Sequence, residues 1–258
     1  MSVLLSEQRG STLVLTLNRP EVLNALSNEL THALLSAIRA AEERRDLRSI
    51  LVTAAGDRAF SAGTDLKERS GLSAEGKWAQ SQALWDVNQA LWNSSKAVIA
   101  APAGWCLGGG FVLCLYCDLR IAADDVSFGW PEMTLGAYPG SGTTVILSRI
   151  VGRSKAKEML FTARRFGADE ALSMGLVERV VPRAQLLDSA LDWAREMEVT
   201  SPLGLAAVKR SINEGADRPM EEAAAIDQAL RRPLESTRDY EEGIRAHFEK
   251  RKPVFRGE

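Results

Sequence analysis

The sequence predicts an α/β body followed by a mostly helical C-terminal region. In the first half of the 258 residues, short apolar runs typical of buried strands alternate with longer segments of helical periodicity. From Thr143 onward, helical spacing dominates. The length and a hydrophobic content of 45% fit one large domain with a helical extension. We therefore divide the chain into a core at residues 1–185 and a C-terminal helical region at residues 186–258.

Strands and helices are expected in alternation from the N-terminus. Alternating residues predict a strand at 12–17, which a turn around Asn18 and Pro20 ends. Leucines at helical spacing predict a helix from about Leu26 to Ala41, with Ser27 as its N-cap. The other elements predicted in this half are a buried strand at 49–54, a loop at 55–67, a helix at 74–93 and a buried strand at 119–123.

The predicted helix at 74–93 carries a row of tryptophans. Trp78, Trp85 and Trp92 are seven residues apart and so lie on one face. Two interpretations stay open: packing against the core or a partner subunit, and an aromatic wall along a substrate pocket.

The stretch at 97–118 reads as a buried strand, a tight turn and a buried helix. Three consecutive glycines, at 108, 109 and 110, stand at the expected start of this helix. Glycine lets a ligand approach the backbone closely, and the first N–H groups of a helix have no intrahelical acceptor. Such donors suit a negatively charged oxygen.

The segment at 126–140 contains two prolines and three glycines and is predicted to form strand ends and loops. Its only charged residue is Glu132. A carboxyl group among apolar neighbours is expected to have a raised pKa and suits acid–base chemistry, whereas the plainer interpretation is an exposed loop glutamate. Beyond it we predict helices at 143–151, 155–162, 169–174, 186–199, 203–213, 220–230 and 240–250, and a short strand at 176–181.

Composition narrows the class of protein. A net charge of −2 gives no basic face, which disfavours nucleic-acid binding. The odd cysteine count, with all three in the central apolar stretch, argues against disulfides, and the CxxC at Cys114 and Cys117 lacks a second ligand pair for zinc. We expect these cysteines to be buried small hydrophobes, and no metal site.

Two features bear on localisation. The N-terminal segment lacks the charged start and long apolar core of a signal peptide, so we expect a cytoplasmic protein. Residues 97–117 carry no charge, but Pro102, Gly104 and the three glycines divide them into halves too short to cross a bilayer.

Six segments then occur in a characteristic order: FSAGTDLKE (60–68), KAVIAAPAGWCLGGG (96–110), CDLRIAADDVSFGWPE (117–132), LGAYPGSG (135–142), GADEALSMGLVERVV (167–181) and FEKRKPVFRG (248–257). Together they resemble the crotonase, or enoyl-CoA hydratase/isomerase, superfamily over essentially the whole chain. The resemblance implies the crotonase fold, in which ββα turns form a spiral core and C-terminal helices mediate trimers or dimers of trimers (hexamers).

The resemblance also implies an acyl-CoA thioester substrate, as in fatty acid metabolism, with no separate cofactor because the substrate carries the CoA. By match to the motifs, the backbone N–H groups of Ala62 and Gly109 would form an oxyanion hole for the thioester enolate. Implied CoA contacts are Val22, Asn24, Ser61, Asp65 and Lys250. Lys250 also has a plain interpretation as a solvated residue of a charged tail.

One position departs from the family pattern. Hydratases of this superfamily use two glutamates to add water across the double bond, and the first of these positions is Val112 here. The second is present as Glu132. A single carboxylate is enough for a 1,3-proton shift, in which Glu132 takes a proton from C2 and returns it at C4. Val112 would also keep the site dry. We therefore expect double-bond isomerisation, with a substrate pocket formed by Val112, Trp85, Trp130, Tyr138 and Gly140.

Alternatives remain. Some relatives with one glutamate add or remove water on cinnamoyl-type or carnitinyl substrates, which keeps a hydratase or lyase open. Some relatives use an aspartate directly after the proline of the LGxxPG loop. In this chain that position is Gly140, which disfavours this variant of the mechanism. Tyr138 is either a packed aromatic or a substrate-positioning hydroxyl. A pseudoenzyme that binds acyl-CoA without turnover is a further hypothesis. A Ser–His hydrolase is disfavoured, because His32 and His247 lie beside no nucleophile motif.

Overall fold

A six-stranded sheet forms the centre of the computed structural model, which describes residues 2–258. Its strands, in spatial order, are β1 (Leu4–Arg9), β2 (Thr12–Leu17), β3 (Ser49–Ala54), β5 (Ala97–Ala100), β7 (Leu119–Ala123) and β10 (Arg179–Val181). β1 and β2 are antiparallel, and every other neighbouring pair is parallel.

A second, four-stranded sheet lies beside the first. It consists of β4 (Ala59–Ser61), β6 (Trp105–Leu107), β8 (Ser127–Gly129) and β9 (Phe166–Gly167), in that order. β4, β6 and β8 run parallel, and β9 is antiparallel to β8. Three times in succession, a strand of the large sheet is followed by a strand of the small sheet and then by a helix. This repeated ββα turn confirms the predicted spiral core.

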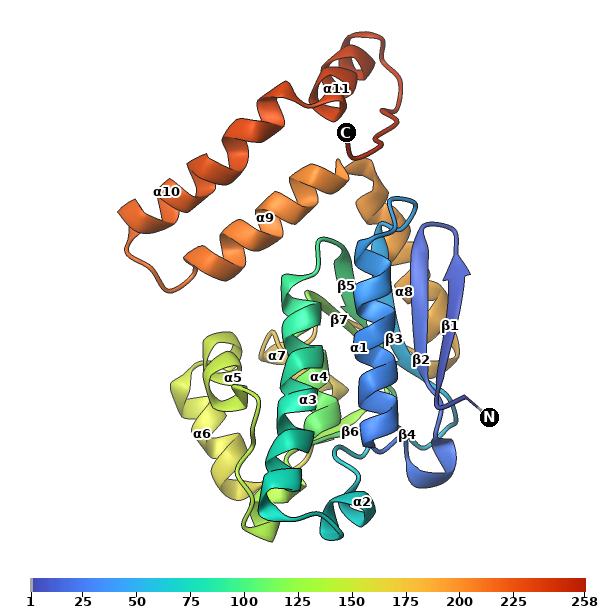
Figure 1. Cartoon of the computed structure of the whole chain (residues 1–258), viewed down its shortest axis with the longest axis vertical. Coiled ribbons are helices and arrows are strands. Elements are labelled where there is room, and N and C mark those ends of the chain that lie inside the picture. Colours follow the sequence, from blue (N-terminus) through green and yellow to red (C-terminus); the bar gives the residue numbers. More distant parts are fainter. Residues whose placement is uncertain (1) are drawn as a thin grey trace.

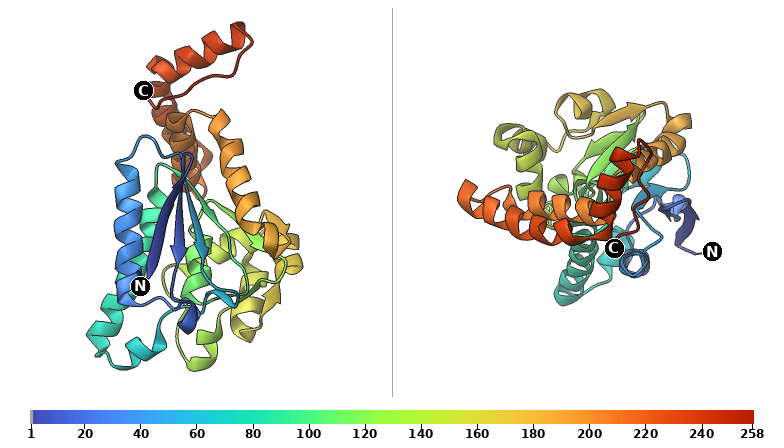
Figure 2. Two further views of the ribbon diagram at one scale, coloured as in Figure 1. Left: turned by 90° about the vertical axis from the view of Figure 1, so that its right-hand side faces the viewer. Right: turned by 90° about the horizontal axis from the view of Figure 1, so that it is seen from above.

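Helices cover both faces of the large sheet (Figures 1 and 2). On one face α1 (Asn28–Glu42) and α3 (Ala74–Asn93) lie side by side, and α8 (Leu186–Glu196) covers the other. The main core lies on the α1 side and includes α4 (Gly109–Leu115), six of whose seven residues are buried. A smaller cluster joins Leu51 and Ile99 of the sheet to Trp193 of α8.

Helix α1 begins and packs as predicted. The Ser27 hydroxyl accepts a hydrogen bond from the Leu30 amide at 3.2 Å, which caps the helix. Leu34 and Ile38 follow at helical spacing and are almost fully buried against the sheet.

The C-terminal helices α9 (Pro202–Gly215) and α10 (Met220–Arg231) pack on one another and project from the core, followed by α11 (Arg238–Phe248) (Figure 1). In the described chain, neither α9 nor α10 has a buried residue. The remaining helices are α2 (Leu66–Ser70), α5 (Thr143–Val151), α6 (Arg153–Thr162) and α7 (Ala168–Ser173), with short 3₁₀ turns η1 (Pro20–Val22), η2 (Pro131–Leu135), η3 (Arg183–Gln185), η4 (Met197–Val199) and η5 (Arg232–Ser236).

Several sequence predictions are confirmed by this fold. The strands at 12–17, 49–54 and 119–123 and the helix at 74–93 have the predicted bounds. The three cysteines are buried and free. Within residues 2–258, none of the helices combines the length and apolar character that a membrane span requires.

Two expectations change. β1 was not predicted, and the loop predicted at 55–67 contains β4 and the start of α2. The tryptophan row does not form one wall. Trp85 and Trp92 pack edge-on against Tyr116, with ring centroids 6.2 and 5.8 Å away, whereas Trp78 is 67% exposed.

Candidate active site

Three chain segments meet at one edge of the small sheet. β4, β6 and β8 are parallel neighbours, so their C-terminal ends lie side by side. The residues that follow them are 62–64, 108–109 and 130–132. A hydrogen bond of 2.9 Å from the Gly108 amide to the Gly129 carbonyl joins two of these segments. The ββα repeat thus brings together the motifs that the sequence analysis singled out.

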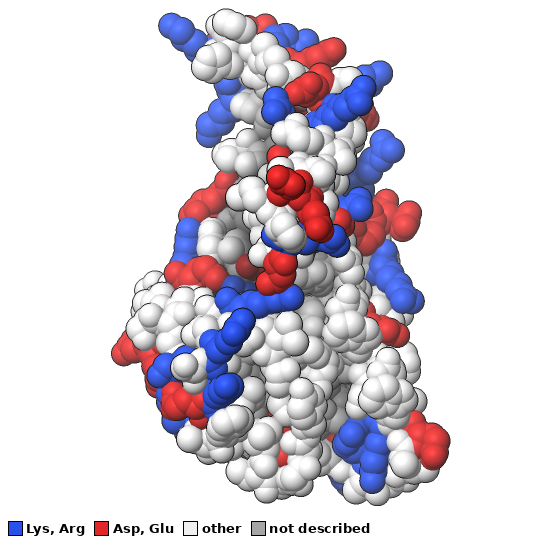
Figure 3. All heavy atoms as spheres, turned by 90° about the vertical axis from the view of Figure 1, so that its left-hand side faces the viewer, with Lys and Arg blue, Asp and Glu red and all other residues white. Residues whose placement is uncertain are grey.

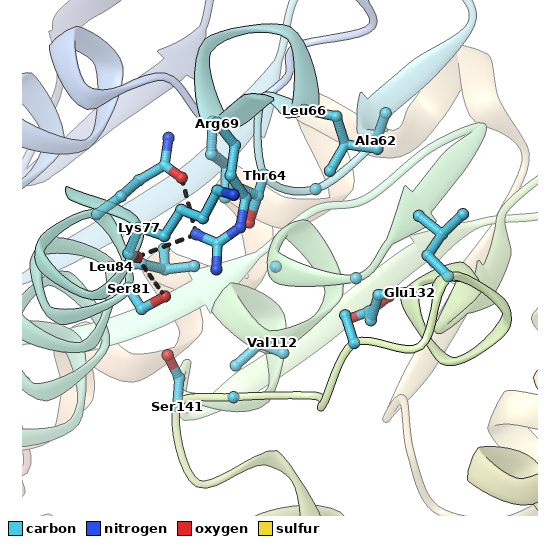
Figure 4. A pocket seen from close by; sticks show the side chains of 18 of the residues that line it. Ala62, Thr64, Leu66, Arg69, Lys77, Ser81, Leu84, Val112, Glu132 and Ser141 are labelled. Carbon is cyan, nitrogen blue, oxygen red and sulfur yellow. Dashed lines mark hydrogen bonds between the residues drawn. The ribbon is translucent and has the colours of Figure 1, made fainter. Parts of the chain in front are cut away.

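These segments border an open pocket of about 420 Å³, which residues of α2, α3 and η2 also line (Figure 4). Six residues predicted for the oxyanion hole, the base or the substrate pocket line it: Ala62, Gly109, Val112, Glu132, Tyr138 and Gly140. Its volume suits a small organic group.

Glu132 lies in the first turn of η2 with its carboxylate against Gly108. A Cβ on Gly108 would come within 2.9 Å of Oε2 and 3.2 Å of Oε1 of Glu132. Burial raises the pKa of the Glu132 carboxyl, and a hydrogen bond from its own backbone only partly opposes this. Among the described residues, Glu132 is the only acid that lines the pocket. It is thus the one carboxylate in the described pocket that is available for acid–base chemistry.

Val112 borders the same cavity from α4 and is 3% exposed (Figure 4). Its methyl groups can neither hold a water molecule nor transfer a proton.

Tyr138 lines the pocket from the loop after η2 and is 74% exposed, so its interpretation as a packed aromatic is wrong. Its hydroxyl lies 3.2 Å from Oγ1 of Thr144.

The backbone amide of Ala62 is not available as an oxyanion donor. It donates to the Leu23 carbonyl at 2.9 Å, a bond inside the protein. Two residues further on, the Thr64 amide donates to no described residue. The Gly109 amide stands at the start of α4, where the helix offers no acceptor. The predicted donor Ala62 is therefore ruled out, and the amides of Thr64 and Gly109 are the candidate pair of donors among the described residues.

Gly63 allows these two amides to come close. Its φ is +93°, and a Cβ there would lie 3.0 Å from the Leu107 carbonyl oxygen and 3.1 Å from the Gly109 nitrogen. On Gly109, a Cβ would lie 3.5 Å from Oγ1 of Thr64. A side chain at 63 would push the two donor segments apart.

Two predicted pocket residues lie elsewhere in the structure. Trp130 is fully buried and packs on Phe111, with ring centroids 4.5 Å apart. Trp85 packs against Tyr116 and does not line the pocket. Both predictions are wrong, because these rings belong to the core next to the site.

None of the five predicted CoA contacts lines the pocket. The side chain of Asn24 is buried, accepts from the Arg19 amide and donates to the carbonyls of Ala55 and Ala59 at 2.8 to 2.9 Å. The Ser61 hydroxyl is also buried and donates to the Asn24 carbonyl at 2.8 Å. Both side chains are buried and bonded within the protein, so neither is free to contact CoA.

The other three predicted CoA contacts differ in exposure. Asp65 caps the start of α2 and forms an ion pair with Arg19 at 2.9 Å, so its carboxylate stabilises the local structure. Val22 lies on the surface with 41% exposure. Lys250 is exposed and follows α11, at the end of the molecule opposite α2 (Figure 1). Within one chain, Lys250 cannot reach this pocket.

The sequence analysis missed Thr64, Arg69 and Lys77, which also line the pocket. Thr64 stands within the segment FSAGTDLKE (60–68). Only the backbone hydrogen bonds of the structure show that its amide donates to no described residue. Arg69 and Lys77 come from α2 and α3, whose packing the sequence does not specify.

Comparison with known proteins identifies the fold and the family. The enoyl-CoA hydratase/isomerase family model matches residues 7–258. The putative enoyl-CoA hydratase/isomerase YngF of Bacillus subtilis is 38% identical over 256 residues, which cover 99% of this chain and 98% of that protein. The 2,3-dehydroadipyl-CoA hydratase of Escherichia coli is 38% identical over 265 residues, which cover 100% of both chains.

A solved structure has the same fold. The enoyl-CoA hydratase from Bacillus anthracis superposes with a TM-score of 0.96 at 34% identity, covering 99% of this chain and 100% of that one. The fold is therefore the crotonase fold, and this chain belongs to the enoyl-CoA hydratase/isomerase family of acyl-CoA enzymes.

Proposed function

We propose that this chain moves the double bond of an enoyl-CoA thioester from C3–C4 to C2–C3 by a 1,3-proton shift. The observation that carries the proposal is that Glu132 is the one acid among the described residues of the pocket, while Val112 stands where hydratases of the family have their first glutamate. The mechanism therefore uses one carboxylate for both proton transfers.

In the first step, the carboxylate of Glu132 removes a proton from C2 of a 3-enoyl thioester. The electron pair moves onto the thioester oxygen and gives a dienolate, whose charge the amides of Thr64 and Gly109 stabilise. One such donor contributes on the order of 3 kcal/mol to a developing oxyanion. In the second step, the carboxyl group of Glu132 gives the proton to C4, which leaves the 2-enoyl thioester and a carboxylate.

The raised pKa of Glu132 suits this cycle. The group must accept a weakly acidic proton and then give it up, so a pKa above the ordinary value brings the base closer in strength to the carbon acid. Burial, the cause of the shift, also keeps water from competing for the dienolate.

A second candidate is hydration of a 2-enoyl-CoA with Glu132 as the only carboxylate. The names of the relatives support it, because the Clostridium acetobutylicum protein, 36% identical over 247 residues, is a short-chain-enoyl-CoA hydratase. This route needs another group to hold the water, and Val112 offers none.

Product analysis distinguishes the two candidates. The purified protein is incubated in D₂O with 2-enoyl and 3-enoyl thioesters, with and without a terminal carboxylate on the acyl chain, and followed by NMR. We expect double-bond migration that Glu132→Gln slows by about 10²- to 10⁴-fold. Water addition is expected only after Val112→Glu supplies a second carboxylate. Formation of 3-hydroxyacyl-CoA by the wild-type protein would favour hydration. Acyl-CoA binding with neither reaction would leave a pseudoenzyme.

A further inference from the structure

Two cationic side chains line the pocket away from Glu132. Arg69 lies in α2 and Lys77 in the first turns of α3, and both are half-buried. Figure 4 shows the Arg69 guanidinium and the Lys77 side chain together on the α3 side, across the cavity from Glu132. The pocket thus has a carboxylate at one side and two positive charges at the other.

The Arg69 guanidinium is held in place and has donors to spare. Its Nη1 donates to the Lys77 carbonyl at 3.1 Å and to Oε1 of Gln80 at 3.0 Å. Its Nε and Nη2 donate to none of the described residues, and neither Arg69 nor Lys77 forms an ion pair with any of them. An oriented guanidinium with a free edge can bind a carboxylate through two parallel hydrogen bonds.

The nearby carboxylate does not neutralise this pair. Oε2 of Glu68 accepts from the Asn28 amide at 2.9 Å and from Nε2 of Gln80 at 3.2 Å. Gln80 thus connects Glu68 to Arg69 without an ion pair between them. A half-buried positive charge without a counterion favours binding of an anion from outside.

Two leucines lie beside Gly109, on the way from the proposed thioester site to the two cations. A Cβ on Gly109 would lie 3.0 Å from Cδ2 of Leu84 and 3.4 Å from Cδ1 of Leu26, so both leucines flank the proposed oxyanion hole. Leu84 stands on α3 two turns beyond Lys77, along the same wall of the pocket. An acyl chain whose carbonyl lies at Gly109 would run along Leu84 towards Arg69.

We propose that Arg69, assisted by Lys77, selects thioesters whose acyl group ends in a carboxylate, that is, CoA monothioesters of short dicarboxylic acids. This inference rests on the proposed function in one respect: the thioester carbonyl lies at Thr64 and Gly109. The charged end is then bound by the guanidinium while the apolar middle contacts the leucines.

Binding of two unreactive thioesters tests this. Adipyl-CoA and hexanoyl-CoA have the same chain length and no double bond, so their affinities, measured by calorimetry, are independent of any isomerisation or hydration. We expect the wild-type protein to bind adipyl-CoA about tenfold more tightly than hexanoyl-CoA. Arg69→Met should reduce this preference to less than about twofold and leave the affinities for hexanoyl-CoA and free CoA unchanged, and Lys77→Met should weaken it in part.

Lys67→Met is the matched control, because it removes a positive charge from the exposed side of the same helix and should keep the preference. Equal affinity of the wild-type protein for the two thioesters overturns the proposal. So does an equal loss of adipyl-CoA, hexanoyl-CoA and CoA binding in Arg69→Met, which would assign Arg69 to the phosphates of CoA. If the preference is present but no thioester is turned over, the selectivity stands and the proposed reaction fails.

Discussion

Glu132 and Val112 stand at the two positions that glutamates occupy in hydratases of the family. Glu132 keeps a carboxylate beside Gly108, and Val112 presents methyl groups to the same cavity. The described residues of the pocket therefore offer one carboxylate for acid–base chemistry. Both residues can be assigned to these positions from the sequence, because each stands at a fixed distance from a recognisable motif.

The raised pKa of Glu132 gives a testable pH dependence. Only the deprotonated carboxylate accepts the C2 proton, so kcat/KM for a 3-enoyl-CoA should rise with pH through a midpoint above the ordinary value of 4.5. A pH–rate profile from pH 4 to 8 measures this midpoint. A midpoint at or below that of an exposed glutamate would contradict a buried base.

The same shift affects stability. Because the pKa is raised in the folded state, folding favours the protonated form of Glu132, and this contribution is lost as the pH rises through the folded pKa. Glu132→Gln should therefore melt at a higher temperature than the wild-type protein at pH 7, while its activity falls by about 10²- to 10⁴-fold. The difference in Tm should shrink near pH 4. A lower Tm at pH 7 would indicate that the charged carboxylate stabilises the fold.

Thr64 and Ala62 differ in what their amides bind, which a backbone substitution can test. Replacing the amide of residue 64 by an ester removes one oxyanion donor and should lower kcat by about 10²- to 10³-fold at nearly unchanged stability. The same replacement at 62 removes the bond to Leu23 and should lower Tm but keep kcat. The reverse pattern would restore Ala62 as the donor.

At the scale of elements, the longer strands and helices are predictable and the short strands are not. The helix at 74–93 shows its period over 20 residues, and its bounds match those of α3. β4, β6 and β8 have three residues each, too few to show any period. β1 exposes five of its six residues at the sheet edge, so it carries no apolar signal. The small sheet that assembles the site therefore follows from pairing of segments distant in the sequence.

An ion pair whose lysine is buried and whose aspartate is half-buried joins helix α9 to the core. Nζ of Lys209 lies 2.8 Å from Oδ2 of Asp118 and also donates to the carbonyls of Leu91 and Lys96. The Lys209 side chain is only 8% exposed, and Asp118 also accepts from the Val98 amide. This cluster holds the projecting helices against the sheet.

Removing Lys209 should loosen α9. Lys209→Met leaves the half-buried carboxylate of Asp118 without its partner, which should cost about 2 kcal/mol in the free energy of unfolding. Urea denaturation measures this loss, and hydrogen exchange should show faster exchange in α9. The control is Arg210→Gln on the same helix, whose exposed partner is Glu214, with an expected change below about 0.5 kcal/mol. Equal effects of the two variants would contradict the anchoring role.

At the scale of the molecule, the C-terminal helices form an arm that the single chain leaves uncovered. Val208, Ile212 and Met220 are 60%, 63% and 81% exposed. On the face seen in Figure 3, charged side chains of both signs gather over this arm and along the edges, around a broad uncharged area. Exposed apolar residues on a projecting arm are typical of a surface that binds another protein.

We expect the protein to be a trimer or a dimer of trimers. Light scattering after size exclusion should give about 84 or about 169 kDa, three or six times the chain mass of 28.1 kDa. Neighbouring subunits would also be needed for Lys250 to approach CoA. A monomer at micromolar concentration would contradict this prediction.

The sequence predicts some residues of the site and cannot predict others. Glu132, Val112 and Gly109 are fixed by motif spacing. The choice between Ala62 and Thr64 depends on which backbone amide is already bonded, and the charges of Arg69 and Lys77 enter the pocket only because α2 and α3 fold over it.

In the proposed reaction one carboxylate carries a proton from C2 to C4. A single-turnover experiment with C2-dideuterated 3-enoyl-CoA in ordinary water, read by NMR, follows that proton. We expect a 2-enoyl-CoA in which a measurable fraction of the deuterium from C2 has moved to C4, and no such product from Glu132→Gln on the same timescale. Complete loss of that deuterium to solvent in the first turnover, or a 3-hydroxyacyl-CoA as the product, would contradict it.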